Sequence, residues 1–79
     1  MKIQILGTGC AKCKKLEENA KEALKKENIQ AEVIKITDLE DIMEMGVMIT
    51  PALAVNGKVF STGKILSSEE ISKIIKGLE

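Results

Sequence analysis

The first part of the chain changes hydrophobic period twice, and this change limits the possible folds more than any other feature. Residues 2–6, "KIQIL", alternate with Ile3 and Ile5 on one face, which predicts a mostly buried strand. From Ala11 onward, apolar residues recur every three or four positions, which predicts an amphipathic helix of about four turns. A β-branched stretch within residues 29–36 predicts a second strand. Because a helix joins these two strands, they should be parallel, with a right-handed crossover.

A second, shorter helix is predicted between Asp38, a favourable N-cap residue, and Gly46, a favourable C-terminal stop. Its apolar residues are expected to form one face: Leu39, Ile42 and Met43. Methionine at these spacings is more often core filler than a metal ligand, so no methionine is assigned to a site. We expect Met43 and Met48 to be buried and Met45 to face solvent.

The rest of the chain predicts a hairpin followed by a final helix. Asn56-Gly57 is the strongest short hairpin signal available, and it would join a strand at 52–55 to a strand at 58–61. Ser67 and Glu70 fit a capping box at the start of the last helix. The whole chain, residues 1–79, is therefore predicted to be a single α/β domain. Its four-stranded mixed sheet would be flanked by three helices.

Composition excludes several classes of function. The chain carries 12 Lys plus Arg, 12 Asp plus Glu, one aromatic residue and no histidine. Balanced charge and missing aromatic platforms argue against nucleic-acid binding. Histidine, which is the commonest general base and the commonest zinc ligand, is therefore absent. The first apolar run is too short for a signal peptide or a membrane span, so we expect a cytoplasmic protein with no membrane partner.

Cys10 and Cys13 are the only cysteines, and they flank the start of the first predicted helix. A disulfide between them would close too small a loop to add much stability. The helix N-terminus should stabilise the Cys10 thiolate and lower its pKa, and Lys12 is the cation best placed to tune it. Cys13 lies one turn further, on the apolar side, where it could attack a mixed disulfide formed at Cys10.

Two alternatives to a redox couple remain open for this pair. Two thiolates suit Cu(I) or Zn, which would make the chain a metal carrier, although they leave a tetrahedral site half-filled. The other alternative is an adaptor that binds partners without turnover, against which the intact pair of cysteines argues. No residue is assigned as a metal ligand.

The order of elements, with C-x-x-C after the first strand and a lone proline before the third, resembles the thioredoxin fold, βαβαββα. "GTGCAKC" and "GVMITPALAVNGKV" are similar to the small thioredoxin/glutaredoxin-like redox-active disulfide proteins. The resemblance implies that Cys10 is the attacking nucleophile and Cys13 the resolving thiol. It also implies that Thr50-Pro51 is a cis peptide whose preceding backbone pairs with the substrate chain. Gly63 would lie near the bound partner.

Three features depart from that pattern. Gly9 stands where typical thioredoxins have an aromatic residue, and Ala11-Lys12 replaces Gly-Pro between the cysteines. The first strand offers no acid to assist the resolving thiol. The heavy-metal-associated domains also carry C-x-x-C after their first strand, but they usually have methionine where this chain has Thr8, and they end on a strand.

The resemblance implies a thiol–disulfide oxidoreductase or electron carrier that reduces or exchanges protein disulfides. No cofactor would be needed beyond the redox-active cysteine pair. The implied partners are protein disulfides and an upstream reductase, and we expect a monomer.

Overall fold

The computed structural model describes residues 1–9 and 11–78, and its element order is the predicted βαβαββα. The elements are β1 Lys2–Leu6, α1 Ala11–Glu27, β2 Glu32–Ile36, α2 Leu39–Glu44, β3 Ala52–Val55, β4 Lys58–Thr62 and α3 Ser68–Leu78. Within these residues, no helix is both long and apolar enough to span a lipid bilayer.

The four strands form one mixed sheet in the order β2-β1-β3-β4. β1 pairs with β2 in parallel, as the intervening helix requires, whereas β3 is antiparallel to both β1 and β4. β1 and β3 occupy the centre, and all four residues of β3 are buried. A continuous apolar strand such as "ALAV" fits this position because both of its faces are covered.

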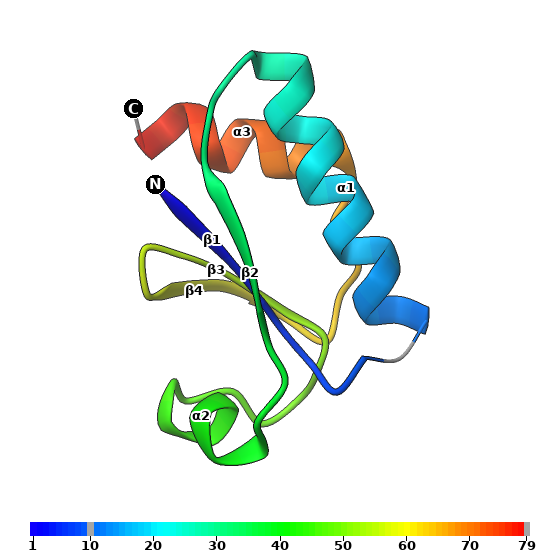
Figure 1. Ribbon diagram of the computed structural model, residues 1–79, viewed down its shortest axis with the longest axis vertical. Helices are drawn as coiled ribbons and strands as arrows, with labels where there is room; N and C mark the ends of the chain where they lie inside the picture. The colour runs from blue at the N-terminus through cyan, green and yellow to red at the C-terminus, as the bar shows by residue number, and fades with distance from the viewer. Residues whose placement is uncertain (10, 79) are drawn as a thin grey trace.

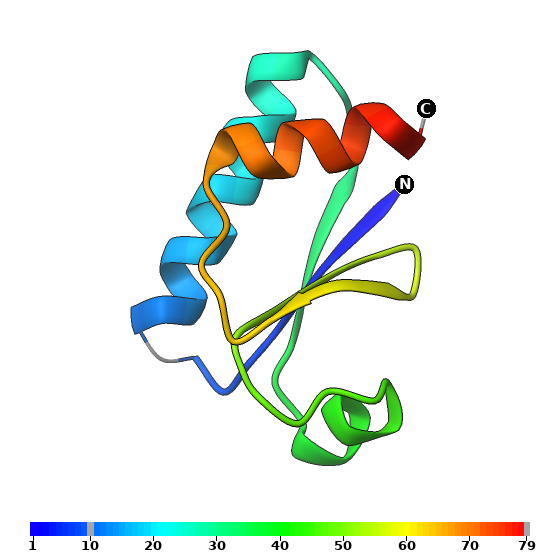
Figure 2. The same cartoon turned by 180° about the vertical axis from the view of Figure 1, so that it is seen from behind.

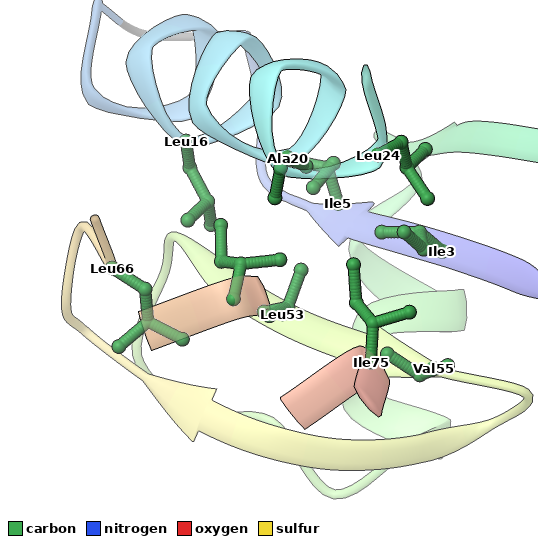
Figure 3. Close-up of a cluster of buried hydrophobic side chains, with 11 residues drawn as sticks. Ile3, Ile5, Leu16, Ala20, Leu24, Leu53, Val55, Leu66 and Ile75 are labelled. Carbon is green, nitrogen blue, oxygen red and sulfur yellow. The ribbon is translucent and has the colours of Figure 1, made fainter. Parts of the chain in front are cut away.

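The two faces of the sheet are covered unequally. α1 and α3 pack together on one face, and α2 lies on the other side of the sheet, near one end of it (Figures 1 and 2). The cluster under α1 and α3 is the larger, and Figure 3 shows Leu16, Ala20 and Leu24 pointing from α1 toward the strands. We call this cluster the main core; its buried members are Ile3, Ile5, Leu16, Ala20, Ala23, Leu24, Leu53, Val55, Leu66, Ile71 and Ile75.

The cluster beneath α2 is smaller, and we call it the minor core. Its buried members are Leu6, Ile42, Val47, Ala52 and Ala54. The expected apolar face of this helix is therefore only partly correct. Ile42 is buried, but Leu39 and Met43 are 60% and 59% exposed.

The predictions for the methionines were wrong. Met48 is 89% exposed and Met43 also faces solvent, whereas Met45 is partly buried and packs against the minor core. The reason is the length of α2: six residues turn one narrow face to the sheet, and Ile42 with Val47 already fills it.

Local signals set most element boundaries. The Asp38 side chain accepts a hydrogen bond of 2.9 Å from the Glu40 backbone N–H, which caps α2. Ser67 and Glu70 form the predicted reciprocal capping box, with both hydrogen bonds at 3.2 Å. Asn56 and Gly57 have φ angles of 53° and 86°, as a type I′ turn requires, so the hairpin is confirmed.

The end of α1 is a Schellman motif. Asn28 has φ 55°, the Asn28 N–H donates to the Lys25 carbonyl at 3.2 Å, and the Ile29 N–H donates to the Leu24 carbonyl at 2.9 Å. Asparagine tolerates this left-handed conformation better than most residues, so it is a suitable helix stop. The motif directs the chain back toward β2, which lies parallel to β1.

Candidate functional site

Cys13 lies in the first turn of α1, with its side chain facing the sheet. It is 5% exposed and belongs to the buried stripe of that helix. Its sulfur rests against Gly7, immediately after β1, so closely that a Cβ at Gly7 would overlap Cys13 Sγ. Gly7 is itself held in place, because its N–H donates to the Ile36 carbonyl at 2.9 Å. The missing side chain at Gly7 is what lets the thiol reach this position.

Pro51 lies beside the same glycine. A Cβ at Gly7 would be 3.9 Å from Pro51 Cα, and the ring of Pro51 is fully buried. The Thr50–Pro51 peptide bond is cis. The fold therefore brings Cys13 and Pro51, which are far apart in the sequence, next to the same glycine, Gly7.

Gly63, which follows β4, is hydrogen-bonded to Pro51, which precedes β3. The Gly63 N–H donates to the Pro51 carbonyl at 2.8 Å, and Gly63 has φ 69°. A Cβ there would be only 2.8 Å from Ile49 Cγ2. Glycine is needed at this position for both reasons, backbone conformation and space.

The segment before Pro51 exposes its side chains. Thr50 is exposed, Ile49 is 63% exposed and Met48 is 89% exposed. Large apolar side chains open to water next to a buried proline form a surface that favours contact with another apolar surface.

A small pocket lies beside Cys13 and Gly7, between α1 and the ends of β1 and β2. It has a volume of about 50 Å³. Its walls combine apolar and charged groups: Ile5, Gly7, Gly9, Cys13, Lys14, Glu17, Lys35 and Thr37. Glu17 Oε1 lies 3.3 Å from Lys35 Nζ, and Glu17 Oε2 lies 3.5 Å from Lys21 Nζ.

The predicted site residues divide into three groups. Cys13, Pro51 and Gly63 are brought together through Gly7 and the backbone, with Thr50 at the exposed edge. Lys12 is exposed in the first turn of α1. Cys10 lies outside the described residues, immediately before α1 in the sequence.

Glu17 and Lys35 were not singled out from the sequence. Both resemble ordinary surface charges, yet the Glu17 side chain is only 13% exposed in its ion pairs. The available signal was spacing: Glu17 follows Cys13 by four residues, and residues four apart are neighbours on a helix. Among residues 1–9 and 11–78, no group of three or more His, Cys, Asp or Glu side chains could hold a metal ion.

Comparison with known proteins agrees with this architecture. A family model described as a thioredoxin domain matches residues 1–76. A protein named thioredoxin from Methanothermobacter thermautotrophicus is 51% identical over 75 residues, covering 95% of this chain and 97% of that relative. A protein of the same name from Methanocaldococcus jannaschii is 43% identical over 74 residues, covering 94% of this chain and 85% of that relative. On this evidence the chain is a thioredoxin-like redox protein and belongs to the thioredoxin family.

Proposed function

We propose that this chain is a thiol–disulfide oxidoreductase in which Cys10 attacks and Cys13 resolves. One observation carries the proposal: the buried Cys13 sulfur lies against Gly7, and Pro51 lies beside the same glycine. This arrangement places a shielded thiol at the start of a 17-residue helix and next to an exposed apolar segment where a partner could bind. The resolving role needs such shielding, because an exposed second thiol would react with other partners.

The reaction transfers two electrons. The Cys10 thiolate attacks one sulfur of a partner disulfide, a Cys10–partner disulfide forms, and the other partner sulfur leaves as a thiolate. The Cys13 thiolate then attacks the Cys10 sulfur, the Cys10–Cys13 bond forms, and the second partner sulfur leaves. The partner is reduced and the cysteine pair is oxidised. A reductase must return two electrons to the pair, and no bound cofactor is required because the sulfurs themselves carry the electrons.

The partner would bind across Thr50, Pro51 and Gly63. The exposed backbone before Pro51 could pair with an extended stretch of the partner chain, as in other cases of strand addition. Met48 and Ile49 supply apolar area next to it. Lys12, exposed in the first turn, is the side chain proposed to favour the Cys10 thiolate. We propose a monomer that works in the cytoplasm, where close cysteine pairs serve reactive roles.

A redox titration of the purified protein tests this function. The wild type should form one reversible intramolecular disulfide, and neither Cys10→Ser nor Cys13→Ser should form it. A stable mixed disulfide with a protein substrate should accumulate in Cys13→Ser and not in Cys10→Ser. Failure of the wild type to cycle would rule the function out, and thiol-dependent retention of stoichiometric Cu(I) or Zn would favour metal carriage instead.

A further inference from the structure

We propose that α2 presents a docking surface for a redox partner protein that carries basic side chains around an apolar residue. This role rests on the proposed function, and it extends the region that a partner covers from Pro51 to α2. We call the region the α2 surface, and its members are Leu39, Glu40, Asp41, Met43 and Glu44.

Two large apolar side chains form the centre of the α2 surface. Leu39 and Met43 are 60% and 59% exposed, and they lie four residues apart, so they are neighbours on one side of the helix. Ile42 is the one apolar residue of α2 that is buried. Paired large apolar side chains that remain open to water mark a surface for contact with another protein.

The rim of the α2 surface is acidic. Glu40, Asp41 and Glu44 are all exposed, and residues 36–57 contain no Lys or Arg. In the part of the chain that the structure describes, every lysine ion pair is made by a carboxylate of α1. The rim is therefore a negative surface that no cation of this chain neutralises, and it attracts a positively charged partner.

Helix stability accounts for only part of this acidic rim. Glu40 and Asp41 lie in the first turn of α2, where a carboxylate interacts favourably with the helix dipole. Glu44 is the last residue of the helix, where a carboxylate is unfavourable, and the last turn has no basic residue. A role outside the helix explains Glu44 better, namely contact with a cationic group of a partner.

A fixed turn joins the α2 surface to the proposed partner-binding segment. Gly46 has φ 82°, and its N–H donates to the Met43 carbonyl at 2.9 Å. The Val47 N–H donates to the Ile42 carbonyl at 3.2 Å, and the Val47 side chain is buried. Four residues of chain, at most about 14 Å, lead from Val47 to Pro51. One protein partner can therefore cover both Pro51 and α2.

The start of α1 carries the opposite charge. Lys12, Lys14 and Lys15 are exposed there, and the first turn contains no acid. Figures 1 and 2 show the end of β1 between this turn and α2. Although the chain is neutral as a whole, its charge near the site is divided between a basic side and an acidic side. This division orients a partner, with its basic side chains toward α2.

Reduction of two disulfide-bridged peptides tests the α2 surface. The peptides share one sequence with leucine beside the disulfide, and they carry either lysine or glutamate on both sides of it. Glu40→Lys combined with Glu44→Lys should lower kcat/KM about fivefold for the lysine peptide and raise it about fivefold for the glutamate peptide. In about 1 M salt, where the Debye length is roughly 3 Å, both changes should disappear.

Glu18→Lys combined with Glu22→Lys is the matched control. Both glutamates are exposed, they are four residues apart on α1, and their reversal changes the net charge by the same amount. This variant should change kcat/KM for either peptide by less than about twofold, because charges far from the bound peptide are screened. Equal effects of the two double variants would show that net charge is responsible, and they would overturn the proposal.

Leu39→Ser combined with Met43→Ser tests the apolar centre. Both side chains are exposed, so the fold should be retained. KM for both peptides should rise about threefold with kcat unchanged, because the leucine loses its apolar contact. An unchanged KM would contradict a docking role for these two residues.

Three further outcomes are distinguishable. If the wild type reduces neither peptide, the proposed function fails. If it reduces both, and reversal of Glu40 and Glu44 changes neither rate, the α2 surface alone is excluded. Analytical ultracentrifugation should show a monomer. A dimer that dissociates on the same reversal would mean that lysines of a second copy cover α2, and it would overturn the assignment of a different partner.

Discussion

The two faces of the sheet differ in what they do with their large apolar side chains. Under α1 and α3 the main core encloses Leu16, Leu53 and Ile75 completely. On the α2 side the minor core is small, and Leu39, Met43, Met48 and Ile49 are each at least 59% exposed. One face therefore supplies most of the apolar burial that stabilises the fold, and the other keeps apolar surface available beside Pro51.

This contrast explains where a redox site can lie. The Cys13 sulfur, Gly7 and Pro51 meet at the end of β1, where the two faces adjoin. The Cys13 thiol belongs to the well-packed side, and the exposed segment before Pro51 belongs to the open side. The exposed apolar surface beside Pro51 is thus separate from the core that positions the Cys13 thiol.

The main core should be the most sensitive to loss of volume. Leu53→Ala removes a fully buried side chain from the central strand β3, so we expect the free energy of unfolding to fall by about 4 kcal/mol. Urea denaturation measures this change. Met48→Ala is the control on the open face, and it should change stability by less than about 0.5 kcal/mol. Equal losses in the two variants would contradict the contrast.

Two adjacent residues of α2 allow a buried and an exposed apolar side chain to be compared within one helix. Ile42 is 1% exposed and Met43 is 59% exposed. We expect Ile42→Ala to cost about 2.5 kcal/mol, less than Leu53→Ala because the smaller cluster can close around the lost volume. Met43→Ala should cost under about 0.5 kcal/mol. A large loss for Met43→Ala would mean that this side chain is buried in solution.

Gly7→Ala tests the junction of the two faces. The added methyl group would overlap Cys13 Sγ, so we expect a loss of about 2 kcal/mol in unfolding free energy, together with slower formation of the cysteine disulfide. Gly77→Ala is the matched control, because Gly77 lies in α3 with open space around its Cα. That variant should gain up to about 1 kcal/mol. Two effects of the same sign would show that the close approach at Gly7 is not decisive.

A smaller effect, of opposite sign, is expected at Ser72 in α3. The residue is 5% exposed, and within residues 1–9 and 11–78 its Oγ has no hydrogen-bond partner. Burying an unsatisfied hydroxyl is unfavourable, so Ser72→Ala should raise the free energy of unfolding by about 1 kcal/mol. Thermal unfolding monitored by circular dichroism measures it. A loss of stability would indicate that the hydroxyl bonds to the helix backbone.

The weakest expected effect on stability is also the most informative about the open face. Met48→Ser should leave the free energy of unfolding within about 0.5 kcal/mol of the wild type. With a protein disulfide as substrate, KM should rise about threefold, as expected for losing partial burial of one large apolar side chain. A small disulfide reagent serves as the control, since it does not reach this surface. An unchanged KM for the protein substrate would exclude Met48 from the surface where we propose that a partner binds.

Local chemistry made much of the fold predictable. The Asp38 cap, the Ser67–Glu70 capping box and the Asn56-Gly57 turn each involve only a few neighbouring residues. The helix starts and the turn that they produce can therefore be predicted without the rest of the chain. The buried stripe of α1 was predicted for the same reason, because that helix is long enough for its period to define one face. α2 has only six residues, so its apolar pattern could not show whether Ile42 or Met43 is the buried residue.

The candidate site was predictable in its residue types and not in its contacts. C-x-x-C after a strand and proline before another strand were visible in the sequence, and they pointed to Cys13 and Pro51. The ion pair between Glu17 and Lys35 could not be predicted from the sequence, since it depends on how α1 crosses β2. Several glutamates of α1 look equivalent in the sequence, and only packing shows that Glu17 is partly buried beside the pocket.

The order of elements, their caps and the turn of the hairpin were thus predictable from the sequence, because they depend on interactions between near neighbours. The strand order β2-β1-β3-β4, the exposure of the methionines and the contact of the Cys13 sulfur with Gly7 became known only from the folded structure. Each of these depends on which distant surfaces meet, and on how much volume is left between them once the larger side chains are packed.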